Sequence, residues 1–162
     1  MKIVIFGSGL IGSQVAAKLA DAGHDVKALG RGDGIDITTG AGIAEAVEGA
    51  DVVVDLTNSP PSWSDDDVLA FFRDGTGHIL AAEEKAGVGH HVILSIVGAD
   101  RLPDSGYMRA KVAQEDLVKA GPTPLHDRPI DPILRVRRRN RRRGNHRRRR
   151  PRNAGTSATH RV

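Results

Sequence analysis

Three polar residues in the second half of the chain have the types and spacing for proton transfer at a carbonyl group. Tyr107 and Lys111 are four residues apart, so on a helix they lie one turn apart on the same face. Ser95 precedes the tyrosine by twelve residues, near the end of an expected strand. In hydride transfer to a carbonyl, a phenol can donate the proton, a nearby ammonium can lower the pKa of that phenol, and a serine hydroxyl can orient the carbonyl. The spacing alone also fits a surface tyrosine and lysine on an amphipathic helix.

A glycine-rich loop near the start of the chain has the spacing of a dinucleotide phosphate site. The loop, GSGLIG at 7–12, directly follows an apolar run at 2–6 and opens a helical pattern. Its first glycine allows a tight turn, its second lets a pyrophosphate approach the backbone, and its third lets the helix pack closely on the strand. The N-terminus of the helix adds unpaired N–H groups and the positive end of the helix dipole. The alternative is a glycine-rich turn that binds nothing.

The end of the second expected strand indicates which dinucleotide the loop would hold. NAD-specific sites usually place an acidic residue about 20 residues beyond the glycine loop, where it bonds the ribose hydroxyls. This chain has Gly30 and Arg31 there, and a guanidinium suits the 2′-phosphate of NADP(H). Asp33 follows two residues on, and Arg31 can also be a solvated loop charge. The sequence therefore favours NADP(H) and leaves NAD(H) open.

Strands and helices alternate along the part of the chain that carries these residues. Short apolar, β-branched runs predict strands at 2–6, 25–29, 35–37, 51–56 and 91–97. Helical periodicity predicts helices at 10–20, 41–50, 68–86 and 107–120, with a break near 75–77 left open. This alternation predicts an α/β fold with a Rossmann-type, doubly wound parallel sheet.

Charge is distributed very unevenly along the chain. Residues 1–124 carry 10 lysines and arginines against 18 aspartates and glutamates, a net charge of −8, and residues 125–162 carry 14 against 2, a net charge of +12. We therefore expect one domain at 1–124, followed by a basic tail at 125–162 that is disordered.

Composition argues against several classes of site and location. The chain has no cysteine, which excludes disulfides and thiolate zinc sites. His90 and His91 are adjacent, so on a strand their side chains point to opposite faces, and no carboxylate or thiol is spaced to complete a metal site with them. We therefore expect no metal site. We place the two histidines in a loop and at the start of a strand. The apolar start at 1–6 is too short for a signal peptide or a membrane span, and we expect a cytoplasmic protein.

Three segments taken in order resemble a known family. GSGLIG at 7–12, DVVVDLTNSP at 51–60 and GVGHHVILSIVGADRLPDSGYMRAKVAQE at 87–115 look like the atypical short-chain dehydrogenase/reductase proteins of the NmrA-like NAD(P)-binding group. The resemblance covers residues 1–124 and departs at Phe6, where many relatives carry a further glycine. The family includes members that bind the cofactor as sensors without turnover. The resemblance therefore leaves a non-catalytic NAD(P) sensor as an alternative to an oxidoreductase.

The resemblance assigns roles to individual residues. It implies a dinucleotide site made by Gly7, Ser8, Gly9, Leu10, Ile11, Gly12, Arg31, Asn58 and Ser59. It implies that Ser95, Tyr107 and Lys111 lie beside the nicotinamide and act on a small-molecule substrate, which the sequence does not identify.

The tail contains twelve arginines within 135–152. One interpretation is a disordered basic arm that binds nucleic acid through salt-sensitive phosphate contacts, without aromatic residues for base stacking. Another is translation out of frame. Read from their second bases, the codons allowed for 126–136 can encode TIVRSTQFFEF, which resembles the strand and pocket loop that follow Gly-x-Pro-Tyr in the family.

The out-of-frame hypothesis predicts one base lost or gained near codons 122–125. It also predicts a sheet that is incomplete after the fifth strand, with the strand at 91–97 left as an exposed edge. The substrate-binding portion would then be missing, cofactor binding would be impaired but retained, solubility would be poor, and turnover would be weak or absent.

Overall fold

A five-stranded parallel sheet forms the centre of the structure, a computed structural model that describes residues 1–121 and 133–136. The strands are β1 (Lys2–Phe6), β2 (Asp25–Leu29), β3 (Val52–Asp55), β4 (His90–Ile96) and β5 (Ile133–Val136). Their order across the sheet is β2-β1-β3-β4-β5, and every neighbouring pair is parallel. This confirms the predicted Rossmann-type fold.

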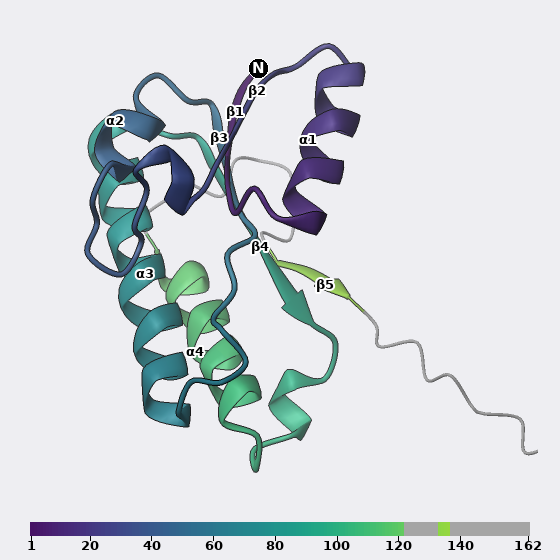
Figure 1. Ribbon diagram of the computed structural model, residues 1–162, viewed down its shortest axis with the longest axis vertical. Coiled ribbons are helices and arrows are strands. Elements are labelled where there is room, and N and C mark those ends of the chain that lie inside the picture. Colours follow the sequence, from purple (N-terminus) through teal and green to yellow (C-terminus); the bar gives the residue numbers. More distant parts are fainter. Residues whose placement is uncertain (122–132, 137–162) are drawn as a thin grey trace, which may run out of the picture.

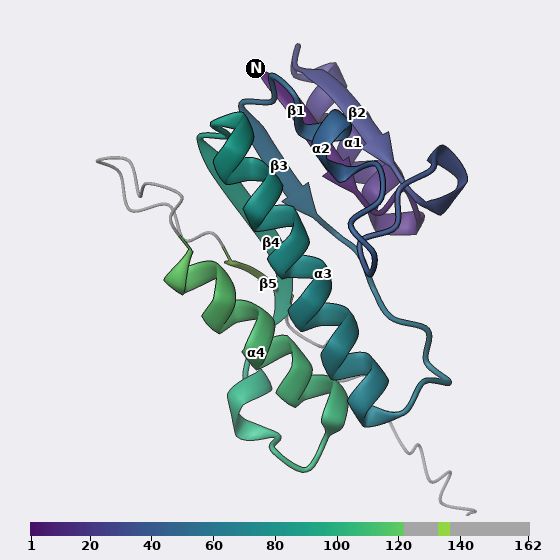
Figure 2. The ribbon, with the colours of Figure 1, turned by 90° about the vertical axis from the view of Figure 1, so that its left-hand side faces the viewer.

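Helices cover both faces of the sheet (Figure 1). One face packs against α1 (Leu10–Asp21), and the other is covered by α2 (Ile43–Val47), α3 (Asp65–Ala86) and α4 (Gly106–Ala120). Figure 2 shows α3 and α4 lying side by side over the sheet. Two short 3₁₀ helices, η1 (Arg31–Asp33) and η2 (Ala99–Arg101), follow β2 and β4.

The core lies between the sheet and the face formed by α2 and α3. Val4, Phe6 and Val53 of the strands are fully buried against Phe72 and Ile79 of α3. Burial of each such side chain stabilises the fold by about 1.5–3 kcal/mol. The central strands are apolar on both faces because helices pack on both, which is why β1 and β3 read as continuous hydrophobic runs.

The strand predicted at 35–37 is wrong. Asp36 makes only an isolated antiparallel bridge with Ala41, and β2 has no further strand beside it among the described residues. The Asp36 carboxylate accepts hydrogen bonds from the amide of Thr38 at 2.9 Å and from its hydroxyl at 2.6 Å. These bonds turn the backbone back on itself, so the segment cannot extend along β2.

The break considered near 75–77 is absent, because α3 runs continuously through these residues. Gly75 is needed there for packing. A Cβ on Gly75 would lie 2.6 Å from Cδ1 of Ile37, so its hydrogen allows the loop after β2 to pack against α3. Gly75 therefore indicates close packing between α3 and the loop after β2, and it does not mark the end of a helix.

The expectation that the strand at 91–97 forms an exposed edge is also wrong. β5 pairs with it in parallel, with Ile93 opposite Ile133. Ile133 is 4% exposed and packs with Ile93 and Val118. Residues of the chain as it is translated, Ile133–Val136, therefore occupy the sheet position beside β4. The rest of the tail lies outside the described residues, so its expected disorder stays a prediction. The domain boundary expected at residue 124 also stays a prediction.

Within the described residues, no helix is both long and apolar enough to cross a membrane.

Candidate functional site

The candidate site lies at the carboxyl ends of β1, β2 and β3. The chain passes from β1 to one side of the sheet and from β3 to the other, and ligands of doubly wound sheets bind in the crevice at this point. A pocket of about 380 Å³ opens there. Its walls include Gly7, Ser8, Gly9, Gly30, Arg31, Asp36, Thr57 and Asn58.

The glycine loop has the geometry of a phosphate cradle. Gly7 has a φ of +101°, and a Cβ on it would lie 2.8 Å from the backbone of Leu56. A Cβ on Gly12 would lie 1.7 Å from the carbonyl oxygen of Gly7. Gly9 precedes α1 as its N-cap without a side-chain cap, and its surroundings are open to 4 Å. The loop therefore leaves bare backbone and uncapped N–H groups facing the pocket, which fits a dinucleotide pyrophosphate.

The structure brings together five of the nine expected cofactor residues. Gly7, Ser8, Gly9, Arg31 and Asn58 line the same pocket. The others lie elsewhere. Gly12 packs on the Gly7 carbonyl, Leu10 and Ile11 are 79% and 50% exposed on the first turn of α1, and Ser59 lines a neighbouring pocket.

The charged pocket residue Asp36 was not anticipated from the sequence. Asp36 lines the pocket beside Arg31, and hydrogen bonds from Thr38 hold the pKa of its carboxyl below the ordinary value, with a smaller contribution from the Arg31 guanidinium. Asp33, the acidic residue considered earlier, accepts a hydrogen bond from the amide of Gly30 at 2.9 Å. The end of the pocket after β2 thus presents both a guanidinium and a carboxylate. Asp36 was expected inside a strand at 35–37, and that expectation gave no indication that its carboxylate would line a pocket.

Tyr107 is positioned at the start of α4, which Ser105 caps by accepting a hydrogen bond from the amide of Met108. Its hydroxyl donates to Oδ1 of Asn58 at 3.0 Å, and its ring meets Phe72 edge-on at 5.8 Å. Burial raises the pKa of the phenol. The group therefore stays protonated at neutral pH and can act as a proton donor.

Lys111 lies one turn beyond Tyr107 and is 4% exposed. Its ammonium donates to Oε1 of Gln114 and lies 4.4 Å from the centre of the Phe72 ring. Burial lowers the pKa of Lys111 to about 8, against the opposing charges of Asp55 and Glu115. Tyr107 and Lys111 both contact Phe72, so they share one face of α4. The pKa of Tyr107 is not lowered as expected from the ammonium; burial raises it.

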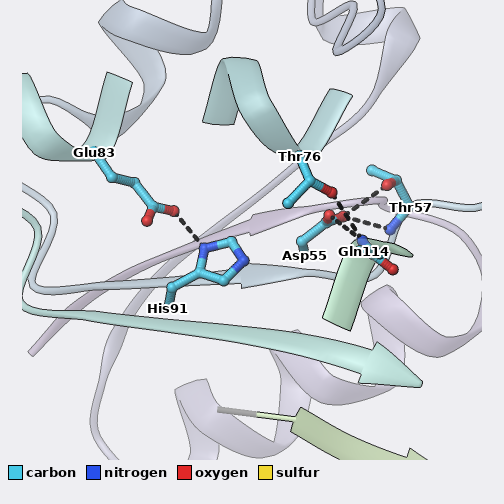
Figure 3. Close-up of polar contacts among 6 residues, drawn as sticks. All are labelled: Asp55, Thr57, Thr76, Glu83, His91 and Gln114. Carbon is cyan, nitrogen blue, oxygen red and sulfur yellow. Dashed lines mark hydrogen bonds and ion pairs between the residues drawn. The ribbon is translucent and has the colours of Figure 1, made fainter. Parts of the chain in front are cut away.

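A buried polar network connects this helix face to the end of β3 (Figure 3). Gln114 donates from Nε2 to Oδ2 of Asp55 at 3.0 Å and to Oγ1 of Thr76 at 3.1 Å. The other oxygen of Asp55 accepts from the amide of Thr57 at 2.9 Å and from its hydroxyl at 2.6 Å. These bonds fix the turn that carries Asn58 toward Tyr107. Satisfied buried networks of this kind specify a single arrangement.

Ser95 is separated from the tyrosine and lysine by its own hydrogen bond. It is 1% exposed on β4, and its hydroxyl donates to Oε1 of Glu115 at 2.6 Å. Ser95 lines neither the glycine-loop pocket nor the pocket beside Tyr107. The structure thus brings Tyr107 toward the glycine-loop pocket through Asn58, and it gives Ser95 a buried structural contact.

His91 and Glu83 form a buried pair near the start of β4 (Figure 3). Nδ1 of His91 lies 2.7 Å from Oε1 of Glu83, so the expectation that no carboxylate accompanies this histidine is wrong. Burial raises the pKa of Glu83, and the contact with His91 opposes this shift. Among the described residues, no group hydrogen-bonds to Glu83 Oε2 or His91 Nε2. Nowhere in 1–121 and 133–136 do three ligand side chains gather as for a metal ion.

No protein-family model and no curated protein sequence matches this chain. Solved structures do match. A short-chain dehydrogenase/reductase superfamily protein from Agrobacterium tumefaciens with bound NAD is 25% identical at a TM-score of 0.63, over 74% of this chain and 44% of that one. MoeE5 in complex with UDP-glucose and NAD is 25% identical at a TM-score of 0.65, over 74% and 48%.

The Bordetella bronchiseptica enzyme WbmH in complex with NAD+ is 18% identical at a TM-score of 0.65, over 84% of this chain and 55% of that one. The chain therefore spans about half the length of the structures it matches. The described strands and helices form a Rossmann fold like that of NAD-binding proteins of the short-chain dehydrogenase/reductase superfamily.

Proposed function

We propose that this chain is the dinucleotide-binding part of an NAD(P)-dependent oxidoreductase of the short-chain dehydrogenase/reductase type, in its NmrA-like group. The observation that carries the proposal is the glycine cradle. Gly9 leaves open space at the pocket wall, between Gly7 and Gly12, whose positions exclude any side chain. The NAD-bound structures of the same fold support it.

The residues beside the cradle suit carbonyl reduction and its reverse. A nicotinamide dinucleotide held there would supply or accept the hydride. We assign proton donation to the Tyr107 hydroxyl, which gives its proton to the carbonyl oxygen as an alcohol forms and regains one from solvent. Asn58, which accepts from that hydroxyl at 3.0 Å, holds the phenol at the pocket. Lys111, with a pKa of about 8, can gain or lose a proton near neutral pH and assist reprotonation.

A non-catalytic dinucleotide sensor is the second candidate. The bond between Ser95 and Glu115 favours it, because the hydroxyl assigned to orient a carbonyl is already engaged. Both candidates require cofactor binding.

Calorimetric titration with NADPH and NADH tests whether the chain binds a dinucleotide, which both candidate functions require, and whether it prefers NADP(H). We expect NADPH to bind more tightly, because Arg31 at the pocket wall can pair with a 2′-phosphate. Arg31→Ala should weaken NADPH by roughly ten-fold or more and leave NADH within about two-fold, since a hydrogen bond to a charged group contributes about 1.5–3 kcal/mol. Arg73→Ala, at an exposed arginine of α3 outside the pocket, is the control. Tighter binding of NADH, unchanged by Arg31→Ala, would contradict the preference.

The arginine-rich segment lies outside the described residues, except for the backbone of β5. We retain the proposal that a reading-frame shift near codons 122–125 produced it and left the chain weakly active, while noting that in-frame residues already pair with β4. Resequencing the gene, together with the intact mass of the protein, tests it. We expect one base lost or gained relative to a frame that encodes TIVRSTQFFEF. An unshifted gene that encodes the arginines would remove the hypothesis and favour a basic arm that binds nucleic acid.

A further inference from the structure

A second pocket of about 390 Å³ adjoins the glycine-loop pocket. Asn58 lines both pockets, so the two meet at the residue that accepts the hydrogen bond from Tyr107. The second pocket is formed by the loop after β3 and the first turns of α3 and α4. Its walls include Ser59, Pro61, Trp63 and Asp65 as well as Tyr107. It has the volume of a small-molecule site, for which roughly 300–1,000 Å³ is usual.

A row of aromatic rings holds the two ends of this pocket in place. Trp63 meets Phe71 edge-on at 5.8 Å, Phe71 meets Phe72 at 5.2 Å, and Phe72 meets Tyr107 at 5.8 Å. Edge-to-face contacts at such distances are favourable. Trp63 and Tyr107 are therefore preset walls, and together with the proline ring of Pro61 they offer aromatic and apolar surface to a ligand.

The pocket also contains a hydroxyl that is free to bind. Ser59 is 6% exposed, lines the pocket, and forms no side-chain hydrogen bond with any residue of the described chain. The hydroxyl oxygen itself is accessible to solvent, so a ligand can replace the water there and hydrogen-bond to it. Ser95, in contrast, is bonded to Glu115 and lies outside the pocket.

The charge around the pocket disfavours anionic ligands. Within the described part of the chain, no lysine or arginine lines it, whereas Asp65 does. Asp66 and Asp67 follow in the first turn of α3, where they oppose the positive end of the helix dipole. Arg109 lies 3.0 Å from Asp65, but both side chains are more than half exposed, so solvent screens this pair. Of these three carboxylates only that of Asp65 lines the pocket, so a phosphate bound there would meet a negative charge and, on the described walls, no lysine or arginine.

We propose that this second pocket binds an uncharged carbonyl or alcohol compound with a flat apolar face, and that Ser59, not Ser95, hydrogen-bonds its oxygen beside Tyr107. The proposal rests on the proposed function, because it places the reacting oxygen where the two pockets meet. It differs from the UDP-glucose of the MoeE5 complex, whose phosphates this pocket would repel.

Trp63 is the single tryptophan of the chain, so its indole N–H gives one signal. Trp63 also lines a further pocket with Thr38 and Asp74, so the Ser59→Ala variant is needed to assign a shift to the pocket beside Tyr107. We would titrate the full ¹⁵N-labelled chain with cyclohexanone and with UDP-glucose and follow that signal. Cyclohexanone should shift it in a saturable manner, and UDP-glucose should not. Ser59→Ala should weaken cyclohexanone by about five-fold, as expected for one lost hydrogen bond. Ser62→Ala, an exposed serine of the same loop outside the pocket, is the matched control, and Ser95→Ala should leave the affinity unchanged.

Several results would overturn the proposal. A shift with UDP-glucose but none with cyclohexanone would refute the ligand class, and weakening by Ser95→Ala but not by Ser59→Ala would refute the role of Ser59. Ser59→Gly provides a second hydroxyl-free variant if the alanine variant does not fold. Calorimetry with NADPH on the same sample separates the hypothesis that the second pocket binds a carbonyl compound from the hypothesis that the glycine-loop pocket binds a dinucleotide. NADPH binding without a cyclohexanone shift rejects the second pocket alone, and a cyclohexanone shift without NADPH binding rejects the proposed function.

Discussion

Gly12→Ala is expected to destabilise the fold by roughly 3 kcal/mol or more, whereas Gly9→Ala should spare the fold and weaken cofactor binding at least ten-fold. The difference follows from where each added methyl group would lie. On Gly12 it would lie 1.7 Å from a backbone oxygen of the same loop, which cannot move without opening the turn after β1. On Gly9 it would contact no protein atom within 4 Å and would lie at the wall of the glycine-loop pocket, where we propose that the cofactor binds.

Thermal or urea unfolding followed by calorimetry with NADPH separates these two effects. Gly77→Ala is the control, because it adds a methyl group inside α3 with nothing within 4 Å and should stabilise that helix slightly. Equal loss of stability in the Gly9 and Gly12 variants would contradict the assigned geometry. Unchanged NADPH affinity in a folded Gly9→Ala variant would contradict the assignment of the pyrophosphate to this loop.

Lys111→Met is expected to remove a pH dependence of stability that the native chain should show in alkaline solution. The pKa of Lys111 is lowered from 10.5 to about 8 in the folded state. Between these pH values the unfolded chain binds a proton that the folded chain has released, so the free energy of unfolding rises with pH. The rise is about 3 kcal/mol over the whole interval, at about 1.4 kcal/mol for each pKa unit.

Urea unfolding at several pH values from 7 to 10 measures this contribution. The native chain should gain stability across the range relative to Lys111→Met. Because other groups titrate in both proteins, the difference between the two curves isolates this lysine. Lys119→Met, at an exposed lysine two turns further along α4, should keep the native slope. If Lys111→Met kept that slope as well, the buried ammonium could not be its source.

Local spacing determined the features that depend on short stretches of chain. The glycine loop was predicted because a buried strand, a turn and a helix start follow one another within twelve residues, and this order is set by neighbouring residues. The common face of Tyr107 and Lys111 followed from the period of the helix alone. The parallel sheet followed from the alternation of strands and helices, whose connections have a preferred hand.

Segments with competing local signals were predicted less well. The run at 35–37 has the residue types of a strand, but the hydrogen bonds of Asp36 to Thr38 outweigh that preference. Gly75 resembled a helix break, although it serves the contact with Ile37. Ile133–Val136 lies in a stretch dominated by charge, so its pairing with β4 could not be anticipated from composition. The contact of Gly75 with Ile37 and the pairing of β5 with β4 both join residues that are distant in the sequence and are brought together by the fold.

The chemical roles of single residues were decided only by the tertiary structure. The sequence analysis assigned Ser95 to the carbonyl and, through the resemblance, Ser59 to the dinucleotide site. In the structure Ser95 is bonded to Glu115, and Ser59 lies in a pocket beside Tyr107. The contact of Gln114 with Asp55 joins residues 59 positions apart, which no periodicity reveals. The sequence thus determined the cofactor loop and the face that carries the tyrosine and lysine. Which polar groups remain free for a ligand depended on the burial and hydrogen bonding of each one, and these properties belong to the folded chain.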